Sequence, residues 1–328
     1  MPDRAARSDG FIAASPCAGW RREPLAGDAS ARRFERLAGP QGTAILMDAD
    51  PATGERLDGF IAIAGHLTAH GLAAPAILAA DTAQGFALVE DLGADHFAAW
   101  LTRHPGDTER LYAAAVDVLV RLQTLPPPPG LPDLGPLRGA AMIAPLFEFY
   151  CPGTDERTRA HVTGLLQEAL LAHAPVARTF ALRDFHVENL IWRPDRSGTD
   201  RVGLIDFQDA VTAAPEYDLT SLLRDARRDV DAGLRDRMMR RFAGATGRAP
   251  DQVAAASAVI GVQRNLRILG IFARLARRHG KRRYLDLLPR VWGHVADDLG
   301  HPALAALAPV LNRHLPPPDA VQIRAILA

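Results

Sequence analysis

The feature that most limits how this chain can fold is a strand-like segment, residues 181–209, inside a stretch whose hydrophobic spacing is otherwise helical. Two short apolar runs in it flank the polar, turn-forming residues Pro194–Asp200. Apolar runs around a turn predict an antiparallel hairpin, which brings the residues before its first strand beside those after its second. We therefore expect Asp184 and Asn189 to lie next to Asp206.

These three side chains are of the types that phosphoryl transfer requires. A carboxylate must accept the proton of the attacking hydroxyl, a second must hold magnesium on the phosphates, and an amide oxygen can complete the metal shell without adding charge. In kinases the amide follows the base by five positions, as Asn189 follows Asp184. Together with the hairpin and the Asp-Phe that ends it, the spacing predicts a base at Asp184 and magnesium ligands at Asn189 and Asp206.

Other interpretations of the segment stay open. The same residues could be turn formers and a strand terminator with no chemical role. A dinuclear carboxylate hydrolase that uses Asp184, His186, Asp206 and Asp209 also agrees with the spacing, although it leaves the N-terminal strands unexplained. A zinc deaminase is excluded, because the Pro-Cys-x-x-Cys sequence that it needs after His-x-Glu does not occur.

Strand patterns dominate the first part of the chain and helical patterns the rest. The apolar and turn-forming residues predict strands at 32–37, 44–47, 76–80 and 86–90, with a helix at 61–70. Later segments have helical spacing, the longest at 253–277, which Gly280 ends. We expect an α+β fold with a small antiparallel-sheet lobe, residues 1–92, and a larger, mainly helical lobe, residues 93–328.

Composition excludes several classes of protein. The 38 basic and 38 acidic side chains balance, which argues against a nucleic-acid or anionic-membrane partner. Lys281 is the only lysine, and because Arg282 follows it the chain has no P-loop. Two cysteines far apart suit a reducing compartment, and no apolar run approaches the roughly 18–20 residues that span a bilayer. We expect a soluble, cytoplasmic monomer.

Several runs of residues carry a resemblance to a known family. They are LAGDASARRF at 25–34, LMD at 46–48, VEDLG at 89–93, RDFH at 183–186 with Asn189, IDFQDA at 205–210, YDL and SLLRD between 217 and 225, QRNLRILGIFARL at 263–275, and YL at 284–285. The chain resembles the aminoglycoside phosphotransferase family and, more narrowly, the bacterial N-acetylmuramate/N-acetylglucosamine anomeric kinases of cell-wall recycling.

The resemblance implies a two-lobed protein-kinase-like fold that binds ATP and Mg²⁺ and transfers the γ-phosphoryl group to the C1 hydroxyl of an N-acetylated amino sugar. It implies Asp184 as the base and Asn189 and Asp206 as metal ligands. A turn would lie over the phosphates, where backbone N–H groups can bind oxygens; its residues are Gly27, Asp28, Ala29 and Ser30. Glu90 and Leu92 would belong to the hinge that pairs with adenine.

One departure from the kinase pattern concerns charge at the phosphates. Kinases carry a phosphate-binding lysine on the third strand, where this chain has Met47 and Asp48. Arg32 or Arg33 could supply the missing charge, or both could be solvated surface residues.

Residues for sugar recognition are predicted from the runs that distinguish the narrower group. An arginine can bind a sugar-acid carboxylate in bidentate fashion, and carboxylates accept hydroxyl hydrogen bonds. Asp209, Arg224 and Arg264 are the candidates, with structural salt bridges as the alternative for each. Asp218 is interpreted as a structural brace of the catalytic loop.

Two other functions remain open at this stage. The chain could phosphorylate another small hydroxylated substrate, such as an aminoglycoside, choline or homoserine. It could also be a catalytically inactive kinase-like binding protein, which the missing lysine favours and the intact Asp184, Asn189 and Asp206 oppose.

Overall fold

The computed structural model describes residues 4–25, 32–175 and 178–328. Contacts between Cα atoms divide the chain into two compact units. The first comprises Met1–Ala114 and Glu188–Asp209, and the second comprises Ala115–Val187 and Ala210–Ala328. The predicted lobes, residues 1–92 and 93–328, are a division drawn from the sequence and stay a prediction.

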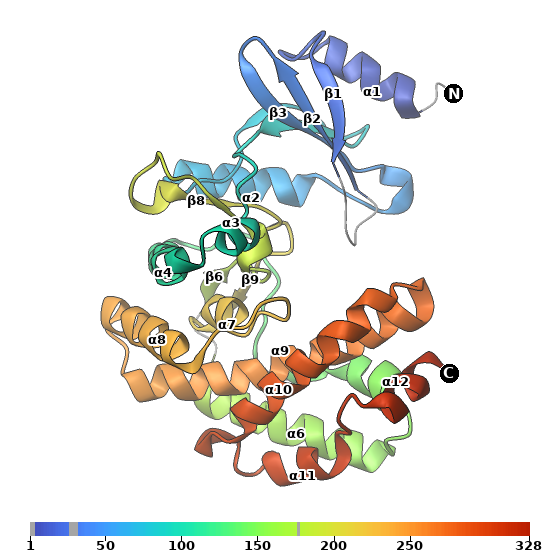
Figure 1. Ribbon diagram of the computed structural model, residues 1–328, viewed down its shortest axis with the longest axis vertical. Helices are drawn as coiled ribbons and strands as arrows, with labels where there is room; N and C mark the ends of the chain where they lie inside the picture. Colours follow the sequence, from blue (N-terminus) through green and yellow to red (C-terminus); the bar gives the residue numbers. More distant parts are fainter. Residues whose placement is uncertain (1–3, 26–31, 176–177) are drawn as a thin grey trace. The chain divides into compact units, whose positions relative to one another are not determined.

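The first unit is built on a five-stranded antiparallel sheet (Figure 1). Its strand order is β1-β2-β3-β5-β4. The strands are β1 (Arg21–Leu25), β2 (Arg33–Gly39), β3 (Gly42–Asp48), β4 (Ile77–Asp81) and β5 (Phe86–Glu90). All four strands expected from the sequence are confirmed within one or two residues at each end, and the antiparallel sheet of the predicted fold class is confirmed with them.

Alternation along the strands explains how this sheet is covered. Leu37, Ala44, Leu46 and Leu88 are fully buried and form one cluster with Ile12 and Cys17. Ile12 belongs to α1 (Arg4–Ala13), an amphipathic helix that the sequence analysis did not predict. The helix therefore packs its apolar side against the sheet, which removes these side chains from water.

The rest of the first unit contains short helices and the predicted hairpin. The helical elements are η1 (Pro51–Thr53), α2 (Asp58–Ala69), α3 (Phe97–Arg103), η2 (Pro105–Asp107) and η5 (Gly198–Arg201), and α4 (Thr108–Gln123) and η4 (Val187–Asn189) cross the boundary between the units. The hairpin consists of β7 (Leu190–Trp192) and β8 (Val202–Leu204), paired antiparallel. Backbone hydrogen bonds anchor it: Trp192 N–H donates to Asp95 O at 2.7 Å, and Leu204 N–H donates to Ala73 O at 2.8 Å.

The second unit is mainly helical, as expected. A small sheet of β6 (Thr179–Ala181) and β9 (Val211–Ala213) accompanies the helices. The helical elements are α5 (Pro136–Ala141), the π-helical η3 (Leu146–Tyr150), α6 (Glu156–His173), α7 (Tyr217–Leu223), α8 (Ala232–Thr246), α9 (Pro250–His279), η6 (Arg282–Leu287), α10 (Leu288–Leu299), η7 (Pro302–Leu304), α11 (Ala308–His314) and α12 (Ala320–Leu327).

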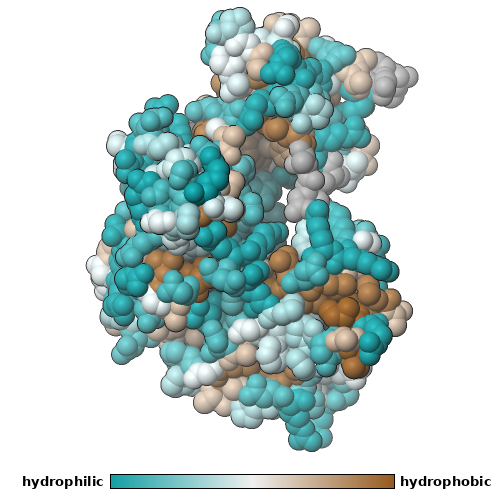
Figure 2. Space-filling model, viewed as in Figure 1, coloured by the Kyte–Doolittle hydropathy of each residue, from teal (hydrophilic) through white to brown (hydrophobic). Residues whose placement is uncertain are grey.

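Helix α9, drawn in orange in Figure 1, runs through the middle of this unit. It packs against η3, α6, α7 and α10, and half of its 30 residues are buried. Gly280 caps it with a left-handed φ of 65°, as the sequence predicted. Figure 2 shows polar residues over much of the visible surface of this unit. Among the described residues, no helix combines the length and apolar character needed to span a membrane.

Candidate functional site

The loop that carries Asp184 begins with a strained turn in the second unit. Asp184 N–H donates to Leu182 O at 2.9 Å, and Arg183 between them has a φ of 73°. An i to i+2 hydrogen bond around a positive φ defines the rarer, strained form of the γ-turn. A bulky residue persists in this conformation only where its surroundings hold it there, and such residues cluster at functional sites.

Asp218 holds the N–H side of this turn. The residue is 4% exposed, and its carboxylate accepts hydrogen bonds from Leu182 N–H at 2.6 Å and Arg183 N–H at 2.9 Å. Burial raises the pKa of Asp218 to about 6, while the two N–H groups and Arg264 favour the ionised form. These contacts show Asp218 as a structural brace of the loop that carries Asp184, as the sequence predicted, while the catalytic role of that loop stays a prediction.

Arg264 binds the carbonyl group of the same turn. Its Nη1 donates to Arg183 O at 3.0 Å, and its Nη2 donates to Ser221 Oγ at 2.5 Å. Its guanidinium carbon lies 4.6 Å from the centre of the Tyr217 ring. Arg264, a sequence candidate for sugar recognition, therefore has structural partners, the alternative that the sequence left open.

His186 is partly buried two residues after Asp184. Loss of solvent lowers the pKa of His186, and Asp225 and Asp184 oppose that shift. The imidazole is therefore neutral near pH 7, which suits a hydrogen-bonded loop residue rather than a cation.

Asn189 and Asp206 meet at the base of the hairpin in the first unit. Asn189 Nδ2 donates to Asp206 Oδ2 at 3.2 Å, although the two residues are 17 positions apart, and Ile205 N–H donates to Asn189 O at 3.1 Å. Asp206 is exposed and has a φ of 59°, a left-handed conformation that is uncommon outside glycine. The predicted juxtaposition of these two side chains is confirmed, and the position of Asp184 beside them stays a prediction.

An amide and a carboxylate side by side suit Mg²⁺ as ligands. Mg²⁺ prefers oxygen and is usually held by one or two protein groups together with substrate phosphates. Within the described ranges, no cluster of three or more His, Cys, Asp and Glu side chains could hold a metal. The pair therefore fits Mg²⁺ that is bound together with substrate phosphates.

The remaining nucleotide candidates all precede residue 93 in the sequence. Gly27, Asp28, Ala29 and Ser30 lie outside the described residues. Arg32 Nε is 2.8 Å from Glu55 Oε2, and Arg33 is exposed at the start of β2. Glu90 ends β5 with Oε1 3.7 Å from Arg193 Nη2, and Leu92 is 8% exposed. Their roles toward phosphate and adenine stay predictions.

The other sugar candidates differ in their surroundings. Asp209 is exposed at the end of the hairpin segment in the first unit. Arg224 in the second unit forms an ion pair with Asp298 and another with Asp297 at 3.3 Å. Asp298 is 5% exposed, so the Arg224 pair is a buried structural contact of the kind that the sequence left open.

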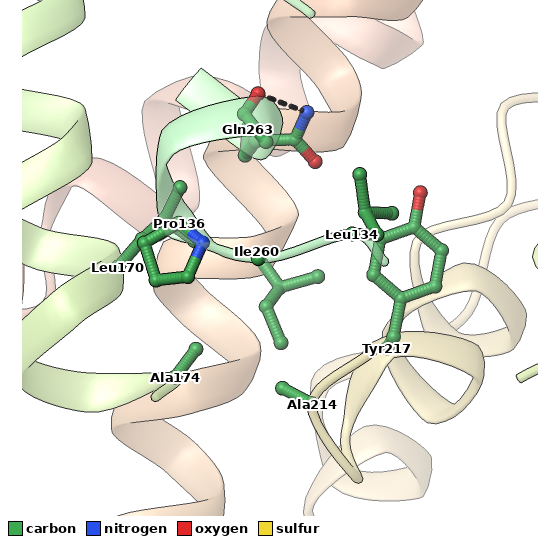
Figure 3. A pocket seen from close by; sticks show the side chains of 10 residues that line it. Leu134, Pro136, Leu170, Ala174, Ala214, Tyr217, Ile260 and Gln263 are labelled. Carbon is green, nitrogen blue, oxygen red and sulfur yellow. Dashed lines mark hydrogen bonds between the residues drawn. The ribbon is translucent and has the colours of Figure 1, made fainter. Parts of the chain in front are cut away.

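A small cavity in the second unit is separate from these residues. It has a volume of about 20 Å³ and lies near Ile260, Gln263 and Tyr217 (Figure 3). Gln263 Nε2 beside it donates to Gly139 O at 2.8 Å. A space of this size holds a single water molecule and is too small for a sugar or a nucleotide.

Sequence reasoning predicted the brace from Asp218 but missed the contact of Arg264 with the Arg183 carbonyl. Ser221 lies in a run that was noted, but no signal pointed to its contact with Arg264. The left-handed backbone of Arg183 has no signal in a single sequence either, because arginine is not a residue that favours this conformation.

Comparison with known proteins identifies the fold as protein-kinase-like. The structure is similar to a choline/ethanolamine kinase family protein from Mesorhizobium loti, with a TM-score of 0.63 and 18% identity, covering 95% of this chain and 100% of that one. It is also similar to the GDP complex of wild-type aminoglycoside 2'-phosphotransferase-IIIa, with a TM-score of 0.65 and 14% identity, covering 90% and 100%.

Similarity in sequence shows the family to which the chain belongs. The model of the phosphotransferase enzyme family matches residues 21–255, and the chain belongs to that family. It is 37% identical to an N-acetylmuramate/N-acetylglucosamine kinase of Caulobacter vibrioides, over 96% of this chain and 97% of that protein. A protein of the same name from Pseudomonas aeruginosa is 32% identical over 88% and 87%. The chain is a phosphotransferase, as the resemblance implied.

Proposed function

We propose that this protein transfers the γ-phosphoryl group of ATP to the C1 hydroxyl of N-acetylmuramate, N-acetylglucosamine or both, as a step of peptidoglycan recycling in the cytoplasm. The observation that carries the proposal is 37% identity, over nearly the full length of both chains, to a relative named for these two sugars. The contact between Asn189 and Asp206 supports the chemistry, because it places two magnesium-compatible oxygen ligands together.

Asp184 is the proposed base. Its carboxylate would accept the proton of the C1 hydroxyl and orient that oxygen toward the phosphoryl group. The anomeric hydroxyl is more acidic than an ordinary alcohol, so a modest base is enough. The contribution of Asp184 is therefore mainly positional, which requires that its backbone be held in one conformation.

Asn189 and Asp206 are the proposed magnesium ligands. A bound Mg²⁺ neutralises the charge that develops on the phosphate oxygens. Asp206 supplies the negative charge, and Asn189 adds a neutral oxygen and restrains Asp206 through its amide hydrogen bond. Gln208 Nε2 donates to Asp206 Oδ1 at 2.8 Å, so two amides limit how the carboxylate can rotate.

The other contacts are proposed from the sequence candidates. The turn Gly27–Ser30 would bind phosphate oxygens with Arg32 or Arg33, and Glu90–Leu92 would bind adenine. Asp209 is the proposed hydroxyl acceptor for the sugar, because the residue lies on the surface of the first unit. Arg224 and Arg264 are the other two candidates for sugar contact, and both also bind protein groups.

A substrate panel tests the proposal. ADP release is measured with ATP, Mg²⁺ and equal concentrations of N-acetylmuramate, N-acetylglucosamine, kanamycin, choline or homoserine, and the position of the phosphate is identified by NMR. We expect turnover with at least one N-acetylated amino sugar and a 1-phosphate product. Turnover with only kanamycin, choline or homoserine, or a product phosphorylated at another hydroxyl, would refute the proposal.

A further inference from the structure

The turn before Asp184 is held by side chains at both its N–H groups and its carbonyl oxygen. Its N–H groups and its carbonyl are bound by two different helices: Asp218 of α7 accepts the N–H groups of Leu182 and Arg183, and Arg264 of α9 donates to the Arg183 carbonyl. Ser221 Oγ also approaches that carbonyl, but at 3.5 Å, the upper limit for a hydrogen bond, so the contact from Arg264 is the stronger of the two.

We propose that Arg264 is a positioning residue for the phosphoryl transfer, which fixes the peptide between Arg183 and Asp184 and thereby the direction of the Asp184 side chain. The proposal rests on the role of Asp184 as the base.

The hydrogen bonds explain why Asp218 alone cannot fix the peptide between Arg183 and Asp184. Asp218 binds the N–H groups of residues 182 and 183, whereas the peptide that leads into Asp184 presents its oxygen on Arg183. Arg183 is the central residue of the strained γ-turn, with a φ of 73°, so a rotation of that peptide about the ψ torsion of Arg183 would open the turn and relieve its strain unless the oxygen is held. The 3.0 Å contact from Arg264 Nη1 holds it.

Arg264 is itself fixed in place. Its Nη2 donates to Ser221 Oγ, and its guanidinium stacks on Tyr217. On either side of it in α9, Gln263 is 2% exposed and Asn265 is fully buried, so its backbone is part of the core of the unit. A rigid helix therefore carries the donor, and the planar guanidinium binds the Arg183 carbonyl of the loop and Ser221 Oγ of α7 at once.

Steady-state kinetics of Arg264→Ala and Arg264→Lys test the proposal. Arg278→Ala is the matched control, because Arg278 lies on the same helix and pairs with Glu148 at 3.4 Å on the surface. We expect kcat of Arg264→Ala to fall about 10- to 100-fold, the size of effect that misplacement of a reacting group produces, with the KM values for ATP and sugar within about twofold.

The conservative variant separates positioning from other roles. Lysine can donate to the Arg183 carbonyl but cannot bind two acceptors with one planar group, so Arg264→Lys should recover part of the lost kcat. Arg278→Ala should keep the wild-type kcat. An unchanged kcat in Arg264→Ala would overturn the proposal, and so would a raised sugar KM at unchanged kcat, which would indicate substrate contact.

A stability cycle tests the restraint without relying on activity. Glycine adopts positive φ without strain, so Arg183→Gly should make the turn less dependent on Arg264. We expect Arg264→Ala to lower the urea midpoint by a smaller amount in the Arg183→Gly background than in the wild type. Equal decreases in the two backgrounds would overturn the proposed restraint.

The two tests also distinguish this proposal from the proposed function. If the wild-type protein phosphorylates none of the sugars, the proposed function fails, and the stability cycle still decides whether Arg264 restrains the turn. If Arg264→Ala is too unstable to purify, Arg264→Lys and the double variant with Arg183→Gly provide the kcat comparison with the same expected order.

Discussion

Gly270→Ala is predicted to destabilise the second unit through a direct backbone clash. At Gly270, α9 passes so close to η3 that an added Cβ would lie 2.2 Å from Pro145 C and 2.3 Å from Leu146 N. Ordinary van der Waals contact begins at 3.4 Å, so one element must move by about 1 Å. Because the opposing atoms are backbone, no side-chain rotation can relieve the overlap.

The magnitude follows from two opposing effects. Overpacking a core by a methyl group costs about 1–3 kcal/mol, and backbone contact places this site at the upper end. Alanine returns about 1 kcal/mol through its higher helix propensity. We therefore expect the free energy of unfolding to fall by about 2 kcal/mol.

Gly244→Ala is the matched control. Gly244 lies on α8 and is exposed, and a Cβ added there would have no other heavy atom within 4 Å. That substitution should raise the free energy of unfolding by about 0.5–1 kcal/mol. Urea denaturation of both variants measures the difference, and a Gly270→Ala protein as stable as the wild type would refute the argument that α9 is packed backbone to backbone.

Three further predictions concern ionisable side chains. Burial and nearby arginines lower the pKa of His294 to about 4, so the folded protein loses stability through this residue as the pH falls from 6.5 to about 4. Burial raises the pKa of Asp298 to about 7, so the folded protein loses stability through this residue as the pH rises from 3.8 to about 7. The free energy of unfolding is measured by urea denaturation at several pH values between 7 and 4. As the pH falls, the His294→Asn variant should gain stability relative to the wild type, and the Asp298→Asn variant should lose it. A variant whose stability changes with pH in the same way as that of the wild type would contradict the pKa shift assigned to its residue. Asp206→Asn should raise the Mg²⁺ concentration for half-maximal turnover by about tenfold or more, since loss of even an outer-shell partner has effects of this size; an unchanged Mg²⁺ dependence would remove Asp206 from the metal site.

The local features of the hairpin could be predicted from the sequence. Apolar runs on both sides of a polar turn define its strands, and the hairpin then brings Asn189 and Asp206 together across 17 positions. Strands β2 to β5 and the end of α9 at Gly280 could also be predicted, because they depend on turn residues and alternation within a few positions, whereas β1 was missed.

The contact of Arg264 with the loop and the unusual backbone angles could not be predicted in this way. Arg264 is 81 positions from Arg183, and helical spacing alone gives no partner for it. The left-handed φ values of Arg183 and Asp206 contradict local preference, so only the surrounding structure reveals them. The same holds for Gly270, whose close neighbour is a π-helical turn far earlier in the chain.

Single-turnover kinetics of Asp184→Asn test the central claim, that Asp184 is the base, most directly. Enzyme in excess over radiolabelled ATP is mixed with Mg²⁺ and N-acetylmuramate, and the affinity for ATP is measured separately by calorimetry. We predict that phosphoryl transfer slows by at least about 100-fold, in line with loss of a general base, while the ATP affinity stays within about twofold of the wild type. Transfer at the wild-type rate by the Asp184→Asn variant would contradict the account.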